Sequence, residues 1–287
     1  MFLPAVSKQM MKTTGRNPSS ASGSLHAGGF TLVELLVVMA IISLLAALLL
    51  PALSVAKAHA LSTGCKNHLQ QMGQAFKMYV DDHQSRYPYY IGPPGPAHGD
   101  AVCLGQGGKG TGLVYWSTKL FPYYQVNWTN VGFHCPAYRG VVSGPFQRGT
   151  IERLGSYGYN VHGTGYTWID PADQTVVKHF GLGPIMTWPD APAVREAQVK
   201  VPSEMLAVTD SQFVKGQASG WPGGPDCLFP GPISGHGFDP KRHGKNYNLL
   251  LCDGHVSAMN PSVLFNRTNT APMWNYDHQP HPELWAP

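Results

Sequence analysis

The chain has 287 residues, of which 13 % are charged, and Gly (33) and Pro (25) are abundant. Its formal net charge of +4 comes mostly from Lys8, Lys12 and Arg16, because 17 basic and 16 acidic side chains remain from Phe30 onward. This near balance excludes the basic surface of a nucleic-acid-binding protein, so we expect no nucleic-acid partner. The low charge content also excludes a disordered tail protein.

Residues 1–29 are polar and small and lack hydrophobic periodicity, which is typical of a leader. From Phe30 to Leu50 the chain is apolar with one charge, Glu34, and this length suits a membrane-spanning helix. Basic residues on the N-terminal side alone predict a cytoplasmic N-terminus. A carboxylate within such a run is costly, so Glu34 is a candidate functional residue. Pro51 predicts a helix kink.

Beyond Pro51 the pattern becomes amphipathic, over residues 51–85. Apolar residues recur three or four positions apart, at Ala58, Leu61, Cys65, Leu69, Met72, Phe76 and Tyr79. This spacing predicts a continuation of the helix with one face packed on a core. Gly64 and Gly73 each cost about 1 kcal/mol relative to Ala, so packing must stabilise this helix.

Residues 86–287 are expected to form a globular head with long Gly/Pro-rich loops. Short apolar or aromatic runs lie between turn signals at 112–116, 132–136 and 156–160. Residues 204–210 predict a strand. The clearest hairpin spans residues 246–259 and turns at Asp253-Gly254, a dipeptide preferred in two-residue turns. We therefore expect an α+β fold, with a long N-terminal α-helix packed on an antiparallel β-sheet.

All the cysteines lie beyond the apolar run, on the predicted outer side, where disulfides form. They are Cys65, Cys103, Cys135, Cys227 and Cys252. None are spaced as C-x-x-C, which argues against a zinc knuckle. We expect one or two disulfides and a buried thiol. Cys103 and Cys227 are candidates for pairing, and Cys65 on the apolar face is expected to stay buried and reduced.

Gly28-Gly29 before Phe30, Thr-Leu-Val-Glu after it and Pro51 closely resemble the N-terminal segment of type IV prepilins and type II secretion pseudopilins. The resemblance implies a pilin-like fold, cleavage by prepilin peptidase between Gly29 and Phe30, and N-methylation of Phe30. It also implies an assembly role for Glu34. Pairing Glu34 with the terminal amine of a neighbouring subunit would offset both desolvation costs. The structural alternative is that Glu34 snorkels to the membrane interface.

The resemblance further implies a structural subunit without a cofactor. We expect a single-pass inner-membrane protein with a periplasmic head. Its expected partners are prepilin peptidase, the inner membrane and other pilin-like subunits in a homo- or hetero-filament. A type II secretion pseudopilus is the preferred assembly. A type IV pilus, which is an extracellular filament, is the alternative.

A different class of protein would result from an ordinary signal peptide. Ala58-His59-Ala60 has the form of a cleavage site, and a cut after Ala60 would release a secreted or anchored head with a binding or hydrolytic role. Against it, the cut falls inside the amphipathic face and removes helix that the head is expected to need.

A second block resembles a segment of large prepilin-like proteins. His243, nine residues and then Asp253-Gly254 match an H-x9-DG segment found near the C-terminus of such proteins. Four stretches match the accompanying pattern: 65–71, 133–136, 156–160 and 202–210. We expect a structural use, with Asp253-Gly254 in the turn and His243 at the start of the first hairpin strand.

A metal site is the sharper alternative for this block. Its candidate ligands are His236, Asp239, His243, Asp253 and His255. Calcium prefers oxygen ligands, and the imidazoles suit zinc better, but neither metal is compelling, so no metal site is assigned.

No catalytic residue is assigned either. The glycine-rich run 105–112 lacks the Ser or Thr that follows the lysine of a phosphate loop, since Gly110 follows Lys109. Neither G-x-S-x-G nor H-E-x-x-H is present. We therefore do not expect an enzyme.

Overall fold

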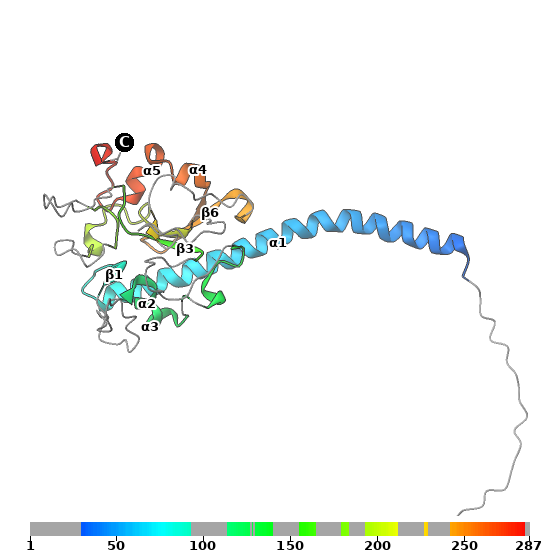
Figure 1. The fold of residues 1–287 in the computed structure, drawn as a ribbon, viewed down its shortest axis with the longest axis horizontal. Coiled ribbons are helices and arrows are strands. Elements are labelled where there is room, and N and C mark those ends of the chain that lie inside the picture. Colours follow the sequence, from blue (N-terminus) through cyan, green and yellow to red (C-terminus); the bar gives the residue numbers. More distant parts are fainter. Residues whose placement is uncertain are drawn as a thin grey trace, which may run out of the picture. The chain divides into compact units, whose positions relative to one another are not determined.

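The computed structural model describes residues 30–92, 114–126, 128, 130–139, 155–164, 179–183, 193–211, 227–228 and 242–284. The helices are α1 (Leu32–Asp82), α2 (Trp116–Lys119), α3 (Phe121–Tyr124), α4 (Pro261–Leu264) and α5 (Arg267–Trp274) (Figure 1). The strands are β1 (Ile91–Gly92), β2 (Val114–Tyr115), β3 (Tyr157–Asn160), β4 (Leu206–Asp210), β5 (Cys227–Leu228), β6 (Tyr247–Leu251) and β7 (Val256–Met259). The chain divides into two compact units between Pro51 and Ala52.

The first unit contains the apolar part of α1. Every side chain from Phe30 to Pro51 is exposed, and Glu34 carries the one charge. A helix that is apolar on all sides needs a membrane or a bundle of other helices around it. By length and composition α1 is a candidate membrane span. The helix continues through Pro51, and the kink predicted there stays a prediction.

The second unit begins with the rest of α1, residues 52–82, which we call the stem. One face of the stem is buried in the core of the head, as the periodicity predicts; its buried apolar members include Cys65, Leu69, Met72, Phe76 and Tyr79. The prediction was wrong at its start, since Ala58 is exposed and Leu61 is half-buried. Apolar spacing marks a helix face, but not the point at which the described part of the head begins to cover it.

Two glycines allow the stem to approach the head closely. A Cβ on Gly73 would lie 2.8 Å from Leu250 Cδ1 and 3.4 Å from the Gly254 backbone. A Cβ on Gly64 would lie 3.2 Å from Pro136 Cγ. Both glycines lower the helix propensity of the stem, but their lack of a side chain allows the close packing.

The sheet of the head has the strand order β5-β3-β4-β6-β7. Strands β3, β4, β6 and β7 pair antiparallel, as predicted, and the two-residue β5 adds parallel to β3. Residues 204–210 were predicted as a strand, and β4 covers Leu206–Asp210 of them. The run 156–160 contains β3. The expected α+β architecture is thus confirmed.

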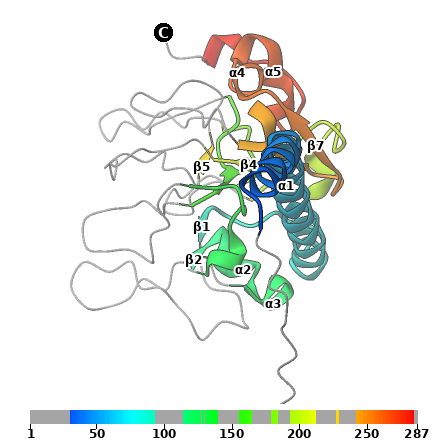
Figure 2. The same ribbon diagram turned by 90° about the vertical axis from the view of Figure 1, so that its right-hand side faces the viewer.

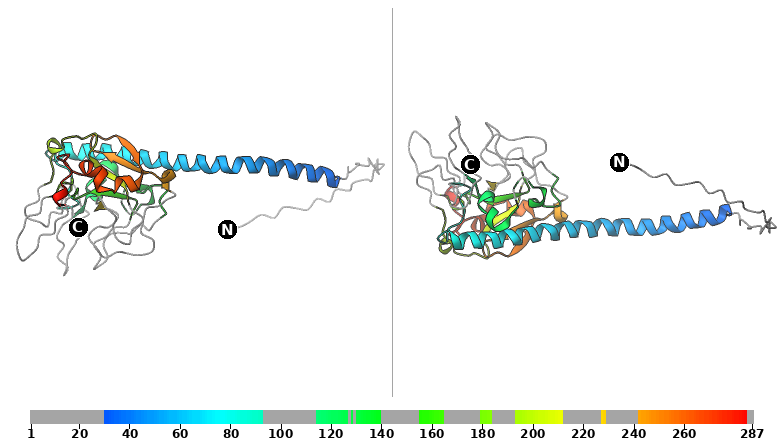
Figure 3. Two further views of the ribbon diagram at one scale, coloured as in Figure 1. Left: turned by 90° about the horizontal axis from the view of Figure 1, so that it is seen from above. Right: turned by 90° about the horizontal axis from the view of Figure 1, so that it is seen from below.

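Both faces of the sheet are covered. On one face, Leu250 of β6 joins the core cluster that includes the buried residues of the stem. On the other, Tyr247, Leu249 and Leu251 pack with Phe265 and Trp274. Figures 2 and 3 show the stem beside the strands, and Figure 2 shows α4 and α5 lying side by side. The head is therefore layered within the second unit, with the sheet between the stem on one face and α4 and α5 on the other.

Helices α4 and α5 were not predicted, although each has a local start signal. The side chain of Asn260 accepts a hydrogen bond from Ser262 N at 2.9 Å, and that of Asn266 accepts one from Thr268 N at 3.1 Å. Asparagine is a preferred N-cap residue. At four and eight residues these helices are too short for hydrophobic periodicity to reveal them.

The hairpin at Asp253-Gly254 is confirmed, but the two-residue turn was wrong. Leu250 pairs with Val256, and Leu251 N donates to His255 O at 3.0 Å, so the loop contains Cys252, Asp253 and Gly254. Gly254 has a φ of 90°. A three-residue loop ending in a left-handed glycine is the next commonest hairpin connection, and its geometry favours glycine at this position.

Candidate functional site

The N-terminal end of α1 is closed by a reciprocal set of hydrogen bonds. The backbone N and the Oγ1 of Thr31 donate to Glu34 Oε2 at 2.8 and 2.7 Å, and Glu34 N donates to Thr31 Oγ1 at 3.2 Å. This is a capping box, which places a carboxylate where the helix dipole favours it. This role was not predicted from the sequence, although the T-x-x-E spacing is its signal. The predicted cleavage residue Gly29 lies outside the described residues.

The apolar surface of α1 is large and continuous along the helix. Phe30 is 73 % exposed and Leu32 is 78 % exposed. Large aliphatic side chains as far as Leu53 and Val55 are also exposed. Exposure of so large an apolar surface to water is unfavourable, so lipid or other apolar helices must cover it.

A second site lies inside the head, where four potential metal ligands from distant segments meet. Cys65 comes from the stem, Cys135 follows the 3-10 turn η1 (Val131–Phe133), Asp210 ends β4, and His243 lies in η3 (Arg242–Lys245). Their ligand atoms all lie within 4.8 Å of one another. We call these four residues the Cys-Asp-His cluster.

The contacts within the cluster are short and specific. Cys135 Sγ lies 3.1 Å from His243 Nε2, and that nitrogen lies 3.4 Å from Asp210 Oδ2. Cys65 Sγ lies 3.5 Å from Asp210 Oδ1. Cys65 and Asp210 are completely buried, and Cys135 is 4 % exposed. Solvent therefore has almost no access to the four ligand atoms.

Asp210 is held from outside the cluster by a charged partner. Arg242 Nη2 lies 2.6 Å from Asp210 Oδ1, and Asn248 N donates to Asp210 Oδ2 at 2.8 Å. The guanidinium also donates to Ser211 O and Ser156 O at 3.2 and 2.8 Å. Burial raises the pKa of Asp210 to about 6, although Arg242 opposes that shift. A buried ion pair this well hydrogen-bonded fixes the orientation of the carboxylate.

The segment that carries Cys135 is also fixed. Cys135 N donates to Ser156 Oγ at 2.7 Å. Ser156 N donates to His134 Nδ1 at 3.2 Å, which leaves His134 Nε2 to donate to Trp128 O at 2.6 Å. Burial lowers the pKa of His134 to about 4, so the ring is neutral at pH 7. Strand β3 thereby positions Cys135 through Ser156, the residue before the strand.

The two thiols differ in their tendency to ionise. Burial raises the pKa of the Cys65 thiol, which accepts a hydrogen bond from Tyr157 Oη at 3.3 Å. Burial also opposes ionisation of Cys135, but hydrogen bonds with Cys65 and His243, together with the nearby charge of Arg242, outweigh it and lower the pKa of this thiol. A thiolate is the form of cysteine that binds metals.

His243 is placed by an unusual backbone. It has a φ of 48° and a ψ of 38°, and the next two residues, Gly244 and Lys245, have φ values of 68° and 77°. Three consecutive left-handed residues are costly for the two that carry side chains. The prediction that His243 starts the strand was wrong, because this turn precedes β6, which begins at Tyr247.

The metal grouping considered from the sequence was wrong for Asp253 and His255. Asp253 and His255 pair with each other at 2.7 Å in the hairpin loop, where both are substantially exposed, at the opposite end of β6 from His243. His236 and Asp239 lie outside the described residues. Among the described residues, the potential metal ligands next to His243 are Cys65, Cys135 and Asp210.

Cysteine pairing is partly settled. Cys65 is buried and unpaired, as expected, and Cys135 and Cys252 are also free thiols. Cys103 lies outside the described residues, and the side chain of Cys227 is not described, so the predicted Cys103–Cys227 pair stays a prediction.

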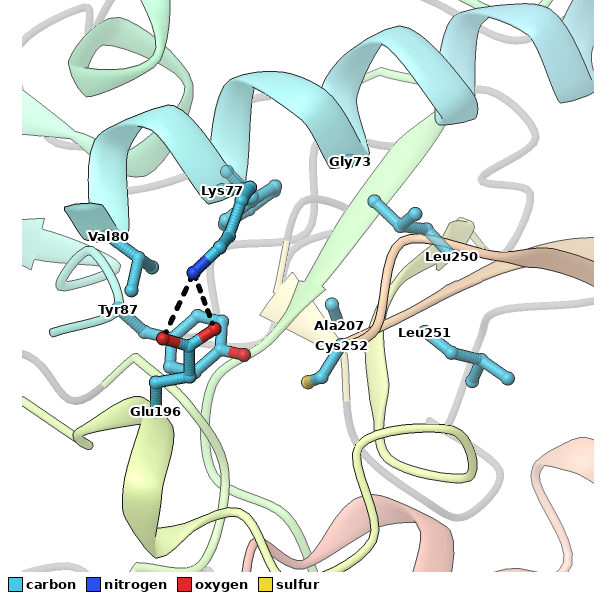
Figure 4. A pocket seen from close by; sticks show the side chains of 10 residues that line it. Gly73, Lys77, Val80, Tyr87, Glu196, Ala207, Leu250, Leu251 and Cys252 are labelled. Carbon is cyan, nitrogen blue, oxygen red and sulfur yellow. Dashed lines mark hydrogen bonds and ion pairs between the residues drawn. The ribbon is translucent and has the colours of Figure 1, made fainter. Parts of the chain in front are cut away.

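A small pocket lies between the stem and the end of β6 (Figure 4). Its volume is about 20 Å³, which is room for a single water molecule. Lys77 from the stem reaches Glu196 across it, with Nζ–Oε distances of 3.0 and 3.2 Å. This pocket is too small to be a substrate site.

One segment of the chain matches a known protein family. Residues 25–50 match the family model described as the prokaryotic N-terminal methylation motif. No curated protein and no solved structure matches the chain with significant similarity.

Proposed function

Because residues 25–50 carry the N-terminal methylation motif of type IV pilin-like proteins, we propose that the chain is a prepilin-like structural subunit and not an enzyme. Prepilin peptidase cleaves it between Gly29 and Phe30, and Phe30 is N-methylated. The apolar part of α1 holds the precursor in the inner membrane, with the head on the periplasmic side. The same helix then packs against other pilin-like subunits in a filament.

The observation that carries this proposal is the uncovered apolar surface of α1. Side chains from Phe30 to Val55 are exposed on all sides of the helix, whereas the stem packs on the head from Cys65 onward. Such a segment can lie in the lipid bilayer before assembly and pack in a bundle of similar helices afterwards, because both surroundings are apolar. Glu34 supports the assembly role, since its carboxylate can pair with the amine that cleavage creates on Phe30 of a neighbour.

The signal-peptide alternative makes a different prediction about the mature chain. The described packing does not exclude it, because residues up to Ala60 are exposed and a cut after Ala60 would leave the buried face of the stem intact. The sequence-based argument against that cut was therefore wrong. The N-terminal residue of the mature protein separates the two functions.

The test is to express the full chain with a prepilin peptidase and to sequence the N-terminus of the membrane-bound product. We expect it to begin at methylated Phe30, and we expect Gly29→Val to leave the precursor uncut. Ala27→Val is the matched control, because it lies two residues before Gly29, and it should be processed normally. A mature chain that begins at Leu61 would overturn the proposal.

Within this class we place the subunit in a type II secretion pseudopilus, with a type IV pilus as the alternative. Both assemblies use an N-terminal segment of this kind, so the experiment must measure secretion and surface filaments directly. Deleting the subunit should block the release of exported proteins and leave surface filaments unchanged. Loss of surface filaments with normal secretion would instead assign it to a type IV pilus.

A further inference from the structure

We propose that Cys65, Cys135, Asp210 and His243 bind one structural zinc ion, which ties the stem to the sheet of the head. The four residues come from the stem, from the segment before β3, from the end of β4 and from the turn before β6. Two sulfurs, one imidazole and one carboxylate are ligands that zinc accepts. A closed set of four protein ligands is characteristic of structural zinc.

Three of the separations between ligand atoms are close to those of a tetrahedral zinc site. Zinc bonds of about 2.0–2.3 Å require neighbouring ligand atoms to be about 3.3–3.8 Å apart in that geometry. Three separations are 3.1 Å from Cys135 Sγ to His243 Nε2, 3.4 Å from that nitrogen to Asp210 Oδ2, and 3.5 Å from Asp210 Oδ1 to Cys65 Sγ. All four ligand atoms lie within 4.8 Å of one another, so shifts of about 1 Å or less would bring every pair to a tetrahedral separation.

Zinc also balances the charge of this buried region. Two thiolates and one carboxylate carry three negative charges, and Zn²⁺ together with Arg242 carries three positive charges. Arg242 is itself buried, and it reaches Asp210 at 2.6 Å. A buried cluster of net charge zero avoids the desolvation cost that isolated thiolates would carry.

Outer contacts orient two of the ligands, and in known zinc sites such contacts hold the ligands in place. Asp210 accepts from Asn248 N, and Cys65 accepts from Tyr157 Oη. The Nδ1 of His243 has no hydrogen-bond partner among the described residues. The left-handed backbone at 243–245 is what directs Nε2 of His243 toward Cys135 and Asp210.

This assignment gives the two ends of the H-x9-DG segment different tasks. His243 is the ligand, and Asp253-Gly254 form the hairpin loop next to Gly73 of the stem. Strand β6 joins the two. The segment thus contacts the stem twice, once through the metal and once through the loop.

The experiment uses the full chain, purified in detergent without chelators. Metal analysis should find about one zinc ion per chain, and Cys65 and Cys135 should resist alkylation until a chelator is added. Replacement of zinc by Co²⁺ should produce the visible absorption of a tetrahedral thiolate site. Removal of zinc should lower the Tm, and re-addition should restore it.

Variants separate a metal site from a structural role of the same residues. Cys135→Ser and His243→Gln should lose the bound zinc, while Cys252→Ser and His255→Gln, which change a thiol and an imidazole outside the cluster, should keep it. Because a cluster variant can fail to fold, the Co²⁺ spectrum of the unmutated chain is the second measurement. Absence of zinc and of a Co²⁺ spectrum, or a Cys65–Cys135 disulfide in the peptide map, would overturn the proposal.

Discussion

At the scale of single residues, Glu34 has two possible tasks that the structure makes distinguishable. In the single chain its carboxylate completes the capping box with Thr31. In a filament it can pair with the amine of Phe30 from a neighbour. A capping box accepts Gln as well as Glu, whereas an ion pair requires the charge.

Glu34→Gln should therefore keep the helix cap, membrane insertion and cleavage but reduce assembly severely. Sheared filament or cross-linked subunit fractions measure the assembly. Thr31→Val is the matched control, because it removes the cap hydroxyl and retains the carboxylate, and it should assemble at near-normal levels. Normal assembly of Glu34→Gln would show that Glu34 acts only as a cap.

At the scale of elements, the contact between the stem and the β6–β7 hairpin depends on the absence of a side chain at Gly73. A Cβ there would already lie 2.8 Å from Leu250 Cδ1. The periodicity of the stem identifies its buried face, but only the packed structure shows why a poor helix former stands in that face.

Gly73→Leu should lower the free energy of unfolding by about 1–3 kcal/mol, because the added side chain overpacks the contact with Leu250 and the hairpin loop. Urea unfolding followed by tryptophan fluorescence measures the change. Gln74→Leu is the matched control, since Gln74 is the exposed neighbour, and its effect should stay within about 0.5 kcal/mol. Equal midpoints for the two variants would contradict the close packing at Gly73.

At the scale of the whole molecule, buried neutral histidines make the stability of the head depend on pH. His162 is 2 % exposed, and burial, with His179 nearby, lowers its pKa to about 3. The unfolded chain binds a proton at this residue below about pH 6.5, whereas the folded chain does not. The stability contributed by the neutral ring is therefore complete above pH 6.5 and is lost as the pH falls toward 3.

His162 alone should reduce the free energy of unfolding by about 2 kcal/mol between pH 7 and pH 5. Urea midpoints at several pH values measure this slope. His162→Gln should make the profile less steep over that range by about this amount, while the slope that His134 contributes remains. An unaltered slope in His162→Gln would mean that other groups cause the acid sensitivity.

The long N-terminal helix could be predicted from the sequence because its signals are local. The apolar run, Glu34, Pro51 and the amphipathic spacing of the stem all operate within one helix, where neighbours in sequence are neighbours in space. The antiparallel sheet was also predictable, since short apolar runs and an Asp-Gly turn are local as well. The three-residue hairpin loop was not predictable, because its length depends on the register of the paired strands. Helices α4 and α5 were missed because they are too short for hydrophobic periodicity.

The Cys-Asp-His cluster was decided by tertiary structure alone. Cys65 and Asp210 are 145 residues apart, and Cys135 and His243 are 108 apart. No spacing rule connects such residues, and grouping histidines by proximity in sequence placed His243 with the wrong partners. By itself the sequence determined the long N-terminal helix, its apolar run and the buried face of the stem. Only the fold, by bringing the stem, β4 and the turn before β6 together, determined which side chains share a buried site.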